Sequence, residues 1–359
     1  MSDKTSQYQI AIELLQQLIS TPSFSKEEDN TANILLKFLS QHKVPAEREG
    51  NNIWAKNKYF DTSKPTLLLN SHHDTVRPNP GFTRDPFLPS IEEGKLYGLG
   101  SNDAGGALVS LIAVFLQFFE RHDLTFNLVI AATAEEEISG VNGIGSVWSH
   151  LPPIDFVLVG EPTSTDMAIA EKGLLVLDCV SHGKAGHAAR EEGENAIYLA
   201  MKDIEWFQNF QFPKISPMLG TVKMSVTIIQ AGQAHNLVPP ECAFTVDIRV
   251  TEAYTLEEIL ETVKQNVASI VTPRSLRLRP SGIRESHPLV QAGKKIGRKL
   301  YGSPTSSDQA LIPVPSAKMG PGDSARSHSA DEFILLQEIE EGIEQYTLLL
   351  EALHQTPGA

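Results

Sequence analysis

Apolar residues follow two different patterns along the first part of the chain. Residues 7–19 and 31–39 carry them at every third or fourth position, which is typical of amphipathic helices. Residues 104–119 are apolar around the whole circumference and begin with small side chains, which predicts a buried helix. Continuous apolar runs, typical of fully buried strands, occupy residues 66–70, 128–133 and 156–159. This alternation predicts an α/β layer structure with a mostly parallel sheet.

The middle of the chain has a different order of elements. The pattern predicts, in sequence, strand 174–180, helix 196–207, strand 221–229, strand 242–250, helix 256–270 and strand 275–278. This β-α-β-β-α-β order is the signature of a small ferredoxin-like unit. After Pro288 the first pattern returns, and residues 331–353 have the spacing of one long amphipathic helix. We therefore expect a three-layer α/β/α domain of residues 1–172 and 281–359, interrupted by an inserted α+β domain of residues 173–280.

Composition and charge narrow the class of protein. The 359 residues are 41% hydrophobic, which allows a sizeable core, and the net charge of −14 disfavours nucleic acid and anionic membranes as partners. Cys179 and Cys242 are too few for a disulfide scaffold, and we expect both to be buried thiols. Because the N-terminus is polar, we expect no signal peptide. The sequence contains no run of about 18 apolar residues, so we expect no membrane span. A reduced, cytoplasmic location is expected.

Carboxylates and imidazoles follow the predicted strands. Because reactive groups collect at the carboxyl ends of strands in open α/β sheets, each loop after a strand is of interest. The relevant stretches are Ser-His-His-Asp at 71–74, Gly-Leu-Gly-Ser-Asn-Asp at 98–103, three glutamates at 135–137, Gly-Glu-Pro-Thr at 160–163, and Gly-Pro-Gly-Asp at 320–323 followed by His328. Every one of these loops offers a potential metal ligand.

Converging carboxylates need positive charge, and no cluster of lysine or arginine accompanies these loops. Divalent metal ions would supply it, and histidine with carboxylate but without thiolate suits zinc, with cobalt and manganese also possible. Two such ions held by Asp103, Glu137 and Glu161 would leave one positive charge for a bound hydroxide. His72 and Asp74 face the same way at a strand end, so Asp74 is placed to accept the second ring proton of a metal-bound His72.

The motifs H-x-D after a strand, G-x-x-D before a helix, T-A-E-E-E, G-E-P-T and a distal G-P-G-D…H resemble those of the acetylornithine deacetylase and succinyl-diaminopimelate desuccinylase family of co-catalytic zinc hydrolases. The resemblance covers essentially the whole chain. It implies that His72 and Glu161 hold one metal, that Glu137 and His328 hold the other, and that Asp103 bridges the two. It also makes Glu136 the general base, and Glu135 a variable acidic neighbour that is either solvated or close behind the ligands.

The same family uses its inserted domain as a dimerisation lid, so the resemblance implies a homodimer. His187, in Gly183-Lys184-Ala185-Gly186-His187, would stabilise the tetrahedral oxyanion, often across the dimer. Asn236 and Arg249 would contact the substrate, and Arg249 could grip an α-carboxylate because its planar fork of donors fits that group. Each of the three has a simpler alternative, namely an ordinary loop histidine, a turn residue and a partner of Asp247.

The implied activity is metal-dependent removal of an N-acyl group from an amino acid, first of all the acetyl group of N-acetylornithine in arginine biosynthesis. N-acetyl- or N-succinyl-citrulline, succinyl-diaminopimelate, N-acetyl-lysine and dipeptides remain alternative substrates. The family commonly follows its bridging aspartate with Met-Lys-Gly, whereas Asp103 is followed by Ala104-Gly105-Gly106, which suggests a subgroup with a different substrate. A metal-free binding protein that keeps the fold is the alternative outside this class.

Overall fold

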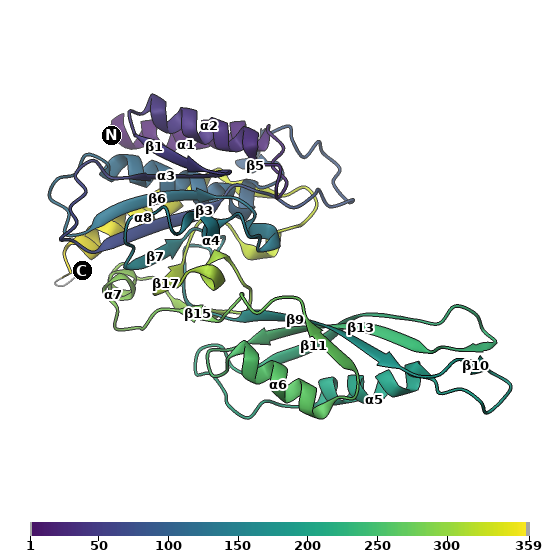
Figure 1. Cartoon of the computed structure of the whole chain (residues 1–359). Coiled ribbons are helices and arrows are strands. Elements are labelled where there is room, and N and C mark those ends of the chain that lie inside the picture. Colours follow the sequence, from purple (N-terminus) through teal and green to yellow (C-terminus); the bar gives the residue numbers. More distant parts are fainter. Residues whose placement is uncertain (1, 357–359) are drawn as a thin grey trace. The chain divides into compact units, whose positions relative to one another are not determined.

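The computed structural model describes residues 2–356, and for residues 2–6 only the backbone (Figure 1). The chain forms two compact units. The first contains the chain up to Ile169, Gly282–Tyr301, and the chain from Ser307 onwards. The second contains Ala170–Ser281 together with Gly302–Ser306. The short segment Gly302–Ser306 also belongs to the second unit, although the residues before and after it belong to the first. The sequence pattern does not predict this second connection.

A nine-stranded sheet forms the centre of the first unit. Its four middle strands run parallel in the order β6 (Asn127–Thr133), β3 (Thr66–His72), β7 (Phe156–Val159) and β17 (Ser316–Lys318). On one side β2 (Asn52–Lys56) and β1 (Ala46–Glu49) continue the sheet antiparallel, and on the other side follow β8 (Met167–Glu171), β15 (Ser281–Gly282) and β16 (Leu300–Ser303). The mostly parallel sheet that the apolar runs predict is confirmed.

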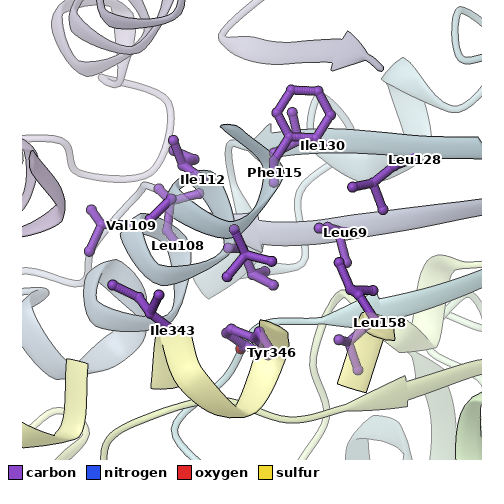
Figure 2. Packing of buried hydrophobic residues seen from close by; sticks show 14 of the residues in the cluster. Leu69, Leu108, Val109, Ile112, Phe115, Leu128, Ile130, Leu158, Ile343 and Tyr346 are labelled. Atoms are coloured by element: carbon purple, nitrogen blue, oxygen red, sulfur yellow. The ribbon is translucent and has the colours of Figure 1, made fainter. Parts of the chain in front are cut away.

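The larger hydrophobic core lies on the face of this sheet that the long helices cover. These helices are α1 (Ser2–Ile19), α2 (Asp29–Gln41), α3 (Gly106–Phe118), α7 (Pro288–Lys295) and α8 (Leu336–His354). Figure 2 shows Leu108 and Phe115 of α3 in the same cluster as Leu69 of β3 and Leu158 of β7. Tyr346 of α8 is also fully buried there and donates its hydroxyl hydrogen bond to the Met319 carbonyl. Each fully buried side chain of this size stabilises the fold by about 1.5–3 kcal/mol.

The opposite face of the sheet has a thinner cover. Trp54, Leu68 and Val129 point to this side and pack with Ile144 and Val147 of the short helix α4 (Ile144–Val147). Leu311 of the turn η3 (Asp308–Leu311) and the following Ile312 cover the rest of this face. The unit therefore has the expected three layers, although they are unequal. Within the described residues, the one helical segment long and apolar enough to cross a membrane, Ser101–Phe118, is 83% buried inside the protein, as a core helix is.

The long helix predicted over residues 331–353 begins later than expected. Residues Phe333–Leu335 form strand β18, which pairs antiparallel with β5 (Lys95–Tyr97), and β5 in turn pairs with β4 (Ser90–Glu92). The run of apolar residues at 333–335 fits a strand as well as a helix, and pairing with β5 decides between them. Helix α8 starts only at Leu336.

The second unit has the ferredoxin-like order that the sequence predicts. Its elements are β9 (Gly173–His182), α5 (Ala196–Asn209), β11 (Lys223–Ala231), β13 (Glu241–Val250), α6 (Leu256–Asn266) and β14 (Ile270–Pro273), and the antiparallel sheet has the order β11-β13-β9-β14. The last strand lies earlier than the predicted 275–278 because α6 already ends at Asn266. The backbone N–H groups of Ala268 and Ser269 donate to Asp203 of α5, and this contact turns the chain into β14.

Candidate metal centre

His72 is held at the end of β3 in an orientation that suits a metal ligand. Its Nδ1 lies 3.0 Å from the backbone carbonyl of Asp74 and 3.5 Å from the Asp74 carboxylate. Because both neighbours are acceptors, the ring proton belongs on Nδ1, which leaves the lone pair of Nε2 free for a metal. This orienting role was expected of the Asp74 carboxylate, but the backbone carbonyl of the same residue is the closer acceptor.

The five predicted ligands of the first unit converge from five separate segments of the chain. The Nε2 atom of His72 lies 3.3 Å from Asp103 Oδ1 and 4.0 Å from Glu161 Oε1. On the other side of Asp103, His328 Nε2 lies 3.7 Å from Asp103 Oδ2 and 2.9 Å from Glu137 Oε2. Asp103 therefore faces both histidines, one through each carboxylate oxygen, which is the geometry expected of a bridging ligand.

The three successive glutamates point to different places because the chain turns sharply there. Glu135 has a left-handed backbone (φ 55°) and leads into the single turn η2 (Glu136–Ile138). Its side chain is buried and accepts hydrogen bonds from the backbone and side chain of Asn142, so the solvated alternative for Glu135 is wrong. Glu136 Oε2 lies 3.8 Å from His72 Nε2, whereas Glu137 turns toward His328.

Two buried carboxylates that the sequence analysis missed stand behind these loops. Glu28 accepts a hydrogen bond from the backbone N–H of Glu135 at 3.1 Å and fixes the start of the glutamate turn. Asp308 accepts from Asn70 of β3 at 2.8 Å and from Thr133 of β6 at 2.7 Å, directly below the strand ends. Neither residue follows a predicted strand, so the rule that selected the ligands could not find them. A third buried carboxylate, Glu332, contacts the loop of Asp103.

Crowding of carboxylates shifts the pKa values of the centre. Burial raises the pKa of the Glu136 carboxyl well above its usual value; the His72 ring opposes this shift, and the carboxylate of Glu161 adds to it. Burial alone would lower the pKa of His72, but its carboxylate neighbours, Glu136 first, raise it well above the usual value. The hydrogen bond to Glu137 raises the pKa of His328 to about 9. The raised pKa values of the two histidines follow from the negative charge of the neighbouring carboxylates.

The donor set fits divalent metal ions. The Nε2 atom of His72 and carboxylate oxygens of Asp103 and Glu137 all lie within 4.8 Å of one another. Imidazole and carboxylate ligands without thiolate suit zinc, cobalt and manganese. When bound, such ions would supply a Lewis acid for a carbonyl group and lower the pKa of water to about 7. Beside them Glu136, whose side chain is 13% exposed and whose pKa is raised, could accept a proton and return it.

Two of the residues predicted in the second unit lie side by side. The strands β10 (Gly186–His187) and β12 (Leu237–Val238) form a two-stranded ribbon, and Ala188 N–H donates to the Asn236 carbonyl at 3.0 Å. Nδ1 of His187 accepts a hydrogen bond from Ala189 N–H at 3.1 Å. The neutral His187 ring therefore carries its proton on Nε2, which can donate to an oxyanion.

Arg249 lies elsewhere, at the end of β13. Its guanidinium makes two hydrogen bonds to the Asp247 carboxylate, Nε to Oδ1 at 2.9 Å and Nη2 to Oδ2 at 3.0 Å. The simpler alternative for this residue, pairing with Asp247, is thus present in the structure. A substrate carboxylate at Arg249 would have to share or displace that partner.

Comparison with known proteins places the fold and the site in a family. The model of "Peptidase family M20/M25/M40" matches residues 68–352, which is most of the chain and includes all five predicted metal ligands. The chain belongs to this family. It is a metal-dependent hydrolase that acts on amide bonds.

Individual members of the M20 family show how far the likeness extends. The chain is 30% identical over 367 residues to an acetylornithine deacetylase of Proteus mirabilis, covering 92% of this chain and 93% of that protein. It is 26% identical over 362 residues to a LysW-lysine/LysW-ornithine hydrolase of Saccharolobus islandicus, covering 97% of each.

Solved structures of the same family share the fold. An M20 family metallo-carboxypeptidase of Sulfolobus solfataricus has a TM-score of 0.77 at 17% identity, with 96% of this chain and 99% of that chain covered. The Bacillus subtilis YXEP protein, described as a dinuclear metal binding peptidase, has a TM-score of 0.74 at 15% identity, with 96% and 98% covered. At these identities the likeness establishes the fold alone.

Proposed function

We propose that this M20 hydrolase removes an N-acyl group from the α-nitrogen of an amino acid, with N-acetyl-L-ornithine as the first candidate, in arginine biosynthesis. The observation that carries the proposal is the convergence of His72, Asp103 and Glu137 within 4.8 Å, with His328 beside Glu137. The 30% identity to an acetylornithine deacetylase supports the choice of substrate. Two free, buried cysteines fit a reducing, cytoplasmic location.

In the proposed site two divalent ions, zinc first and cobalt or manganese as alternatives, would each be held by a pair of residues. His72 and Glu161 would hold one ion, Glu137 and His328 would hold the other, and Asp103 would contribute to both. Glu136 takes a proton from the attacking water and passes it to the leaving amine. Burial, to which the neighbouring Glu161 carboxylate adds, raises the pKa of Glu136 and suits it to hold that proton between the two steps.

We also propose that the chain is a homodimer through the second unit. Strand β11 is an edge strand of the four-stranded sheet, and Ile228 and Ile229 on it are about half exposed. Helix α5, which packs beside β11, exposes Tyr198 (66%) and Met201. An edge strand next to exposed apolar side chains is the kind of surface that a second copy of the same chain would cover.

The geometry of the second unit favours a site shared between two subunits. Arg249 pairs with Leu174 at one end of the sheet, whereas the ribbon with His187 and Asn236 follows the opposite end, beyond Glu241. Eight residue steps of β13 separate the two ends, which is about 27 Å. Figure 1 shows β10 at the tip of the unit. One chain therefore cannot place Arg249 and His187 around the same small amino acid, but two chains could.

A second candidate substrate carries an extra carboxylate on its acyl group. Lys223 is the cross-strand partner of Arg249, and burial together with these two cations lowers the pKa of Lys172. Three cations thus lie near one another, and of these Arg249 is paired with the Asp247 carboxylate. An excess of positive charge attracts an anionic group, so N-succinyl-ornithine or N-succinyl-citrulline is the specific alternative to the acetyl compounds.

A panel of matched substrates tests the proposal. The metal-loaded protein would be assayed for kcat/KM on acetyl- and succinyl-ornithine, acetyl- and succinyl-citrulline, acetyl-lysine, succinyl-diaminopimelate and simple dipeptides. Highest activity on acetyl-ornithine supports the first candidate, and a uniform preference for succinyl over acetyl supports the second. Activity on dipeptides alone would reject N-acyl amino acids as the substrate class.

Metal content tests the alternative outside the enzyme class. Purified protein reconstituted with zinc should hold about two equivalents per chain if the proposed site is a two-metal centre. Glu136→Gln is the matched control, because it should bind the same metal and show no turnover. A chain that holds no metal after reconstitution would favour a binding protein that keeps the fold.

A further inference from the structure

Glu332 is a buried carboxylate outside the predicted ligand set, and it contacts the loop that carries Asp103. Only 2% of the residue is exposed. Its Oε1 accepts hydrogen bonds from the backbone N–H groups of Asn102 at 2.8 Å and Asp103 at 3.0 Å, and its Oε2 accepts from Gly100 at 3.0 Å. One side chain thus binds three amides of a single short loop.

The shape of that loop explains why a carboxylate is needed. Gly100 has a left-handed backbone (φ 74°), and a Cβ there would lie 2.5 Å from the side chain of Thr75. The following turn η1 (Ser101–Gly105) is irregular, and Asp103 within it has an extended conformation (φ −120°, ψ 100°). The amides therefore converge on one point instead of continuing a helix, and convergent N–H groups of this kind favour an anion.

A second contact ties the same loop to the segment that presents His328. The Asn102 side chain accepts from the backbone N–H of Asp323 and donates to its carbonyl, both at 3.0 Å. His328 lies between Asp323 and Glu332 in the chain. The stretch that carries His328 is therefore attached to the Asp103 loop at both ends, once through Asn102 and once through Glu332.

We propose that Glu332 is a positioning residue that sets Asp103 relative to His328 before any metal binds, so that metal affinity depends on it. This inference rests on the proposed roles of Asp103 and His328 as ligands. A ligand loop that is already ordered costs no conformational entropy when the ion arrives, and a support of this type affects metal affinity by about 10- to 100-fold.

The test compares two amide substitutions in adjacent residues. Glu332→Gln replaces an acceptor oxygen by an NH₂ group and removes at least one of the three hydrogen bonds. Asp331→Asn is the matched control, because Asp331 also accepts three hydrogen bonds, from the backbone and hydroxyl of Thr83 and from Arg84 N–H, but none from the Asp103 loop. The dissociation constant for zinc would be measured by competition with a chelator. The melting temperature would be measured on the metal-free proteins.

We expect Glu332→Gln to raise the zinc dissociation constant at least about tenfold and Asp331→Asn to leave it at the wild-type value. Equal effects of the two substitutions, or no effect of either, would overturn the inference while leaving the two-metal hydrolase intact. Wild-type protein without zinc binding would instead reject the proposed function, and the inference with it.

Hydrogen exchange of the metal-free wild type gives an independent answer if Glu332→Gln does not fold. The amides of Asn102 and Asp103 should exchange slowly, because Glu332 holds them without metal. Exchange at the rate of an open loop would show that the metals order this segment, and would overturn the inference.

Discussion

The carboxylate of Asp74 accepts a hydrogen bond from the backbone N–H of Glu136, with 3.0 Å between Oδ1 and N. Its other oxygen accepts from the backbone N–H of Glu137 at 3.2 Å and from the Ser25 hydroxyl at 2.6 Å. The same residue faces Nδ1 of His72. Asp74 therefore orients a predicted metal ligand, chiefly through its backbone carbonyl, and its side chain also fixes the turn that carries the proposed base.

Substitution of Asp74 should affect both roles together. In Asp74→Asn the amide nitrogen would face a backbone N–H, so the turn would lose its fixed position. The His72 ring would keep the backbone carbonyl of residue 74 but lose the carboxylate charge beside Nδ1. We expect metal affinity and kcat each to fall by about 10- to 100-fold, as is typical when the partner of a ligand is removed. Zinc titration and steady-state kinetics measure the two. Ser25→Ala, which removes one donor but keeps the carboxylate, should have a much smaller effect, and an equal effect would contradict this assignment.

The glutamate turn should separate chemistry from metal binding. Glu136→Gln keeps the shape of the side chain but cannot accept a proton, so kcat should fall by at least about 100-fold with unchanged zinc content. Glu137→Ala should lose about one equivalent of zinc per chain, since it removes a ligand from one of two ions. Elemental analysis and kinetics on the same preparations give both numbers. Near wild-type turnover of Glu136→Gln would show that the base is another residue.

Mixed dimers test whether His187 acts across the subunit interface. His187→Ala and Glu136→Gln should each be inactive alone. If the histidine acts across the dimer, a mixed dimer contains one complete site, so an equal mixture after subunit exchange should recover about a quarter of wild-type activity. If His187 acts within its own chain, no complete site forms and the mixture stays inactive.

The substitution Ile229→Glu on the edge strand tests the dimer itself. In sedimentation experiments the otherwise wild-type protein with this substitution should contain more monomer.

His73 predicts an acid-sensitive contribution to stability. Its ring lies 2.9 Å from the Thr31 hydroxyl and 2.9 Å from the Asn51 carbonyl, and burial lowers the pKa of His73 from 6.5 to about 4. Between these values the unfolded chain binds a proton that the folded chain does not. The free energy of unfolding should therefore be highest above pH 6.5 and fall by up to about 3 kcal/mol toward pH 4.

A comparison with His73→Gln isolates this effect. Glutamine can keep both hydrogen bonds but does not titrate. The free energy of unfolding of the variant should therefore decline less between pH 6.5 and pH 4 than that of the wild type. Urea unfolding of the two metal-free proteins across this range measures the difference and avoids acid release of metal. Parallel curves for the two proteins would contradict the prediction.

The sequence predicted the elements whose apolar pattern allows one structure only. β7 matches its predicted range, and β3 and β6 differ by at most two residues, because short continuous apolar runs between polar segments are typical of strands buried on both faces. Boundaries failed where tertiary contacts decide. Residues 333–335 pair with β5 instead of starting α8. After α6, the hydrogen bond from Ala268 to Asp203 turns the chain into β14 earlier than the sequence pattern suggests.

The residues that converge at the centre were easier to predict than the residues that support their loops. His72, Asp103, Glu137 and Glu161 belong to loops next to strand ends or the buried helix, and topology brings such loops together. Glu28, Asp308 and Glu332 hold backbone amides or uncharged side chains, and a sequence shows no pattern for partners of that kind. Burial is their common property, and it becomes visible only in the folded chain.

The division of the chain separates two tasks. All five predicted metal ligands and Glu136 belong to the first unit, whereas His187, Asn236 and Arg249 belong to the inserted one. With the proposed roles, mutations in the insertion would alter which compound is recognised while the metal-binding groups stay unchanged. Duplicated genes with this layout would then have a short evolutionary route to new substrates, because a change of specificity would not require the reactive centre to be rebuilt.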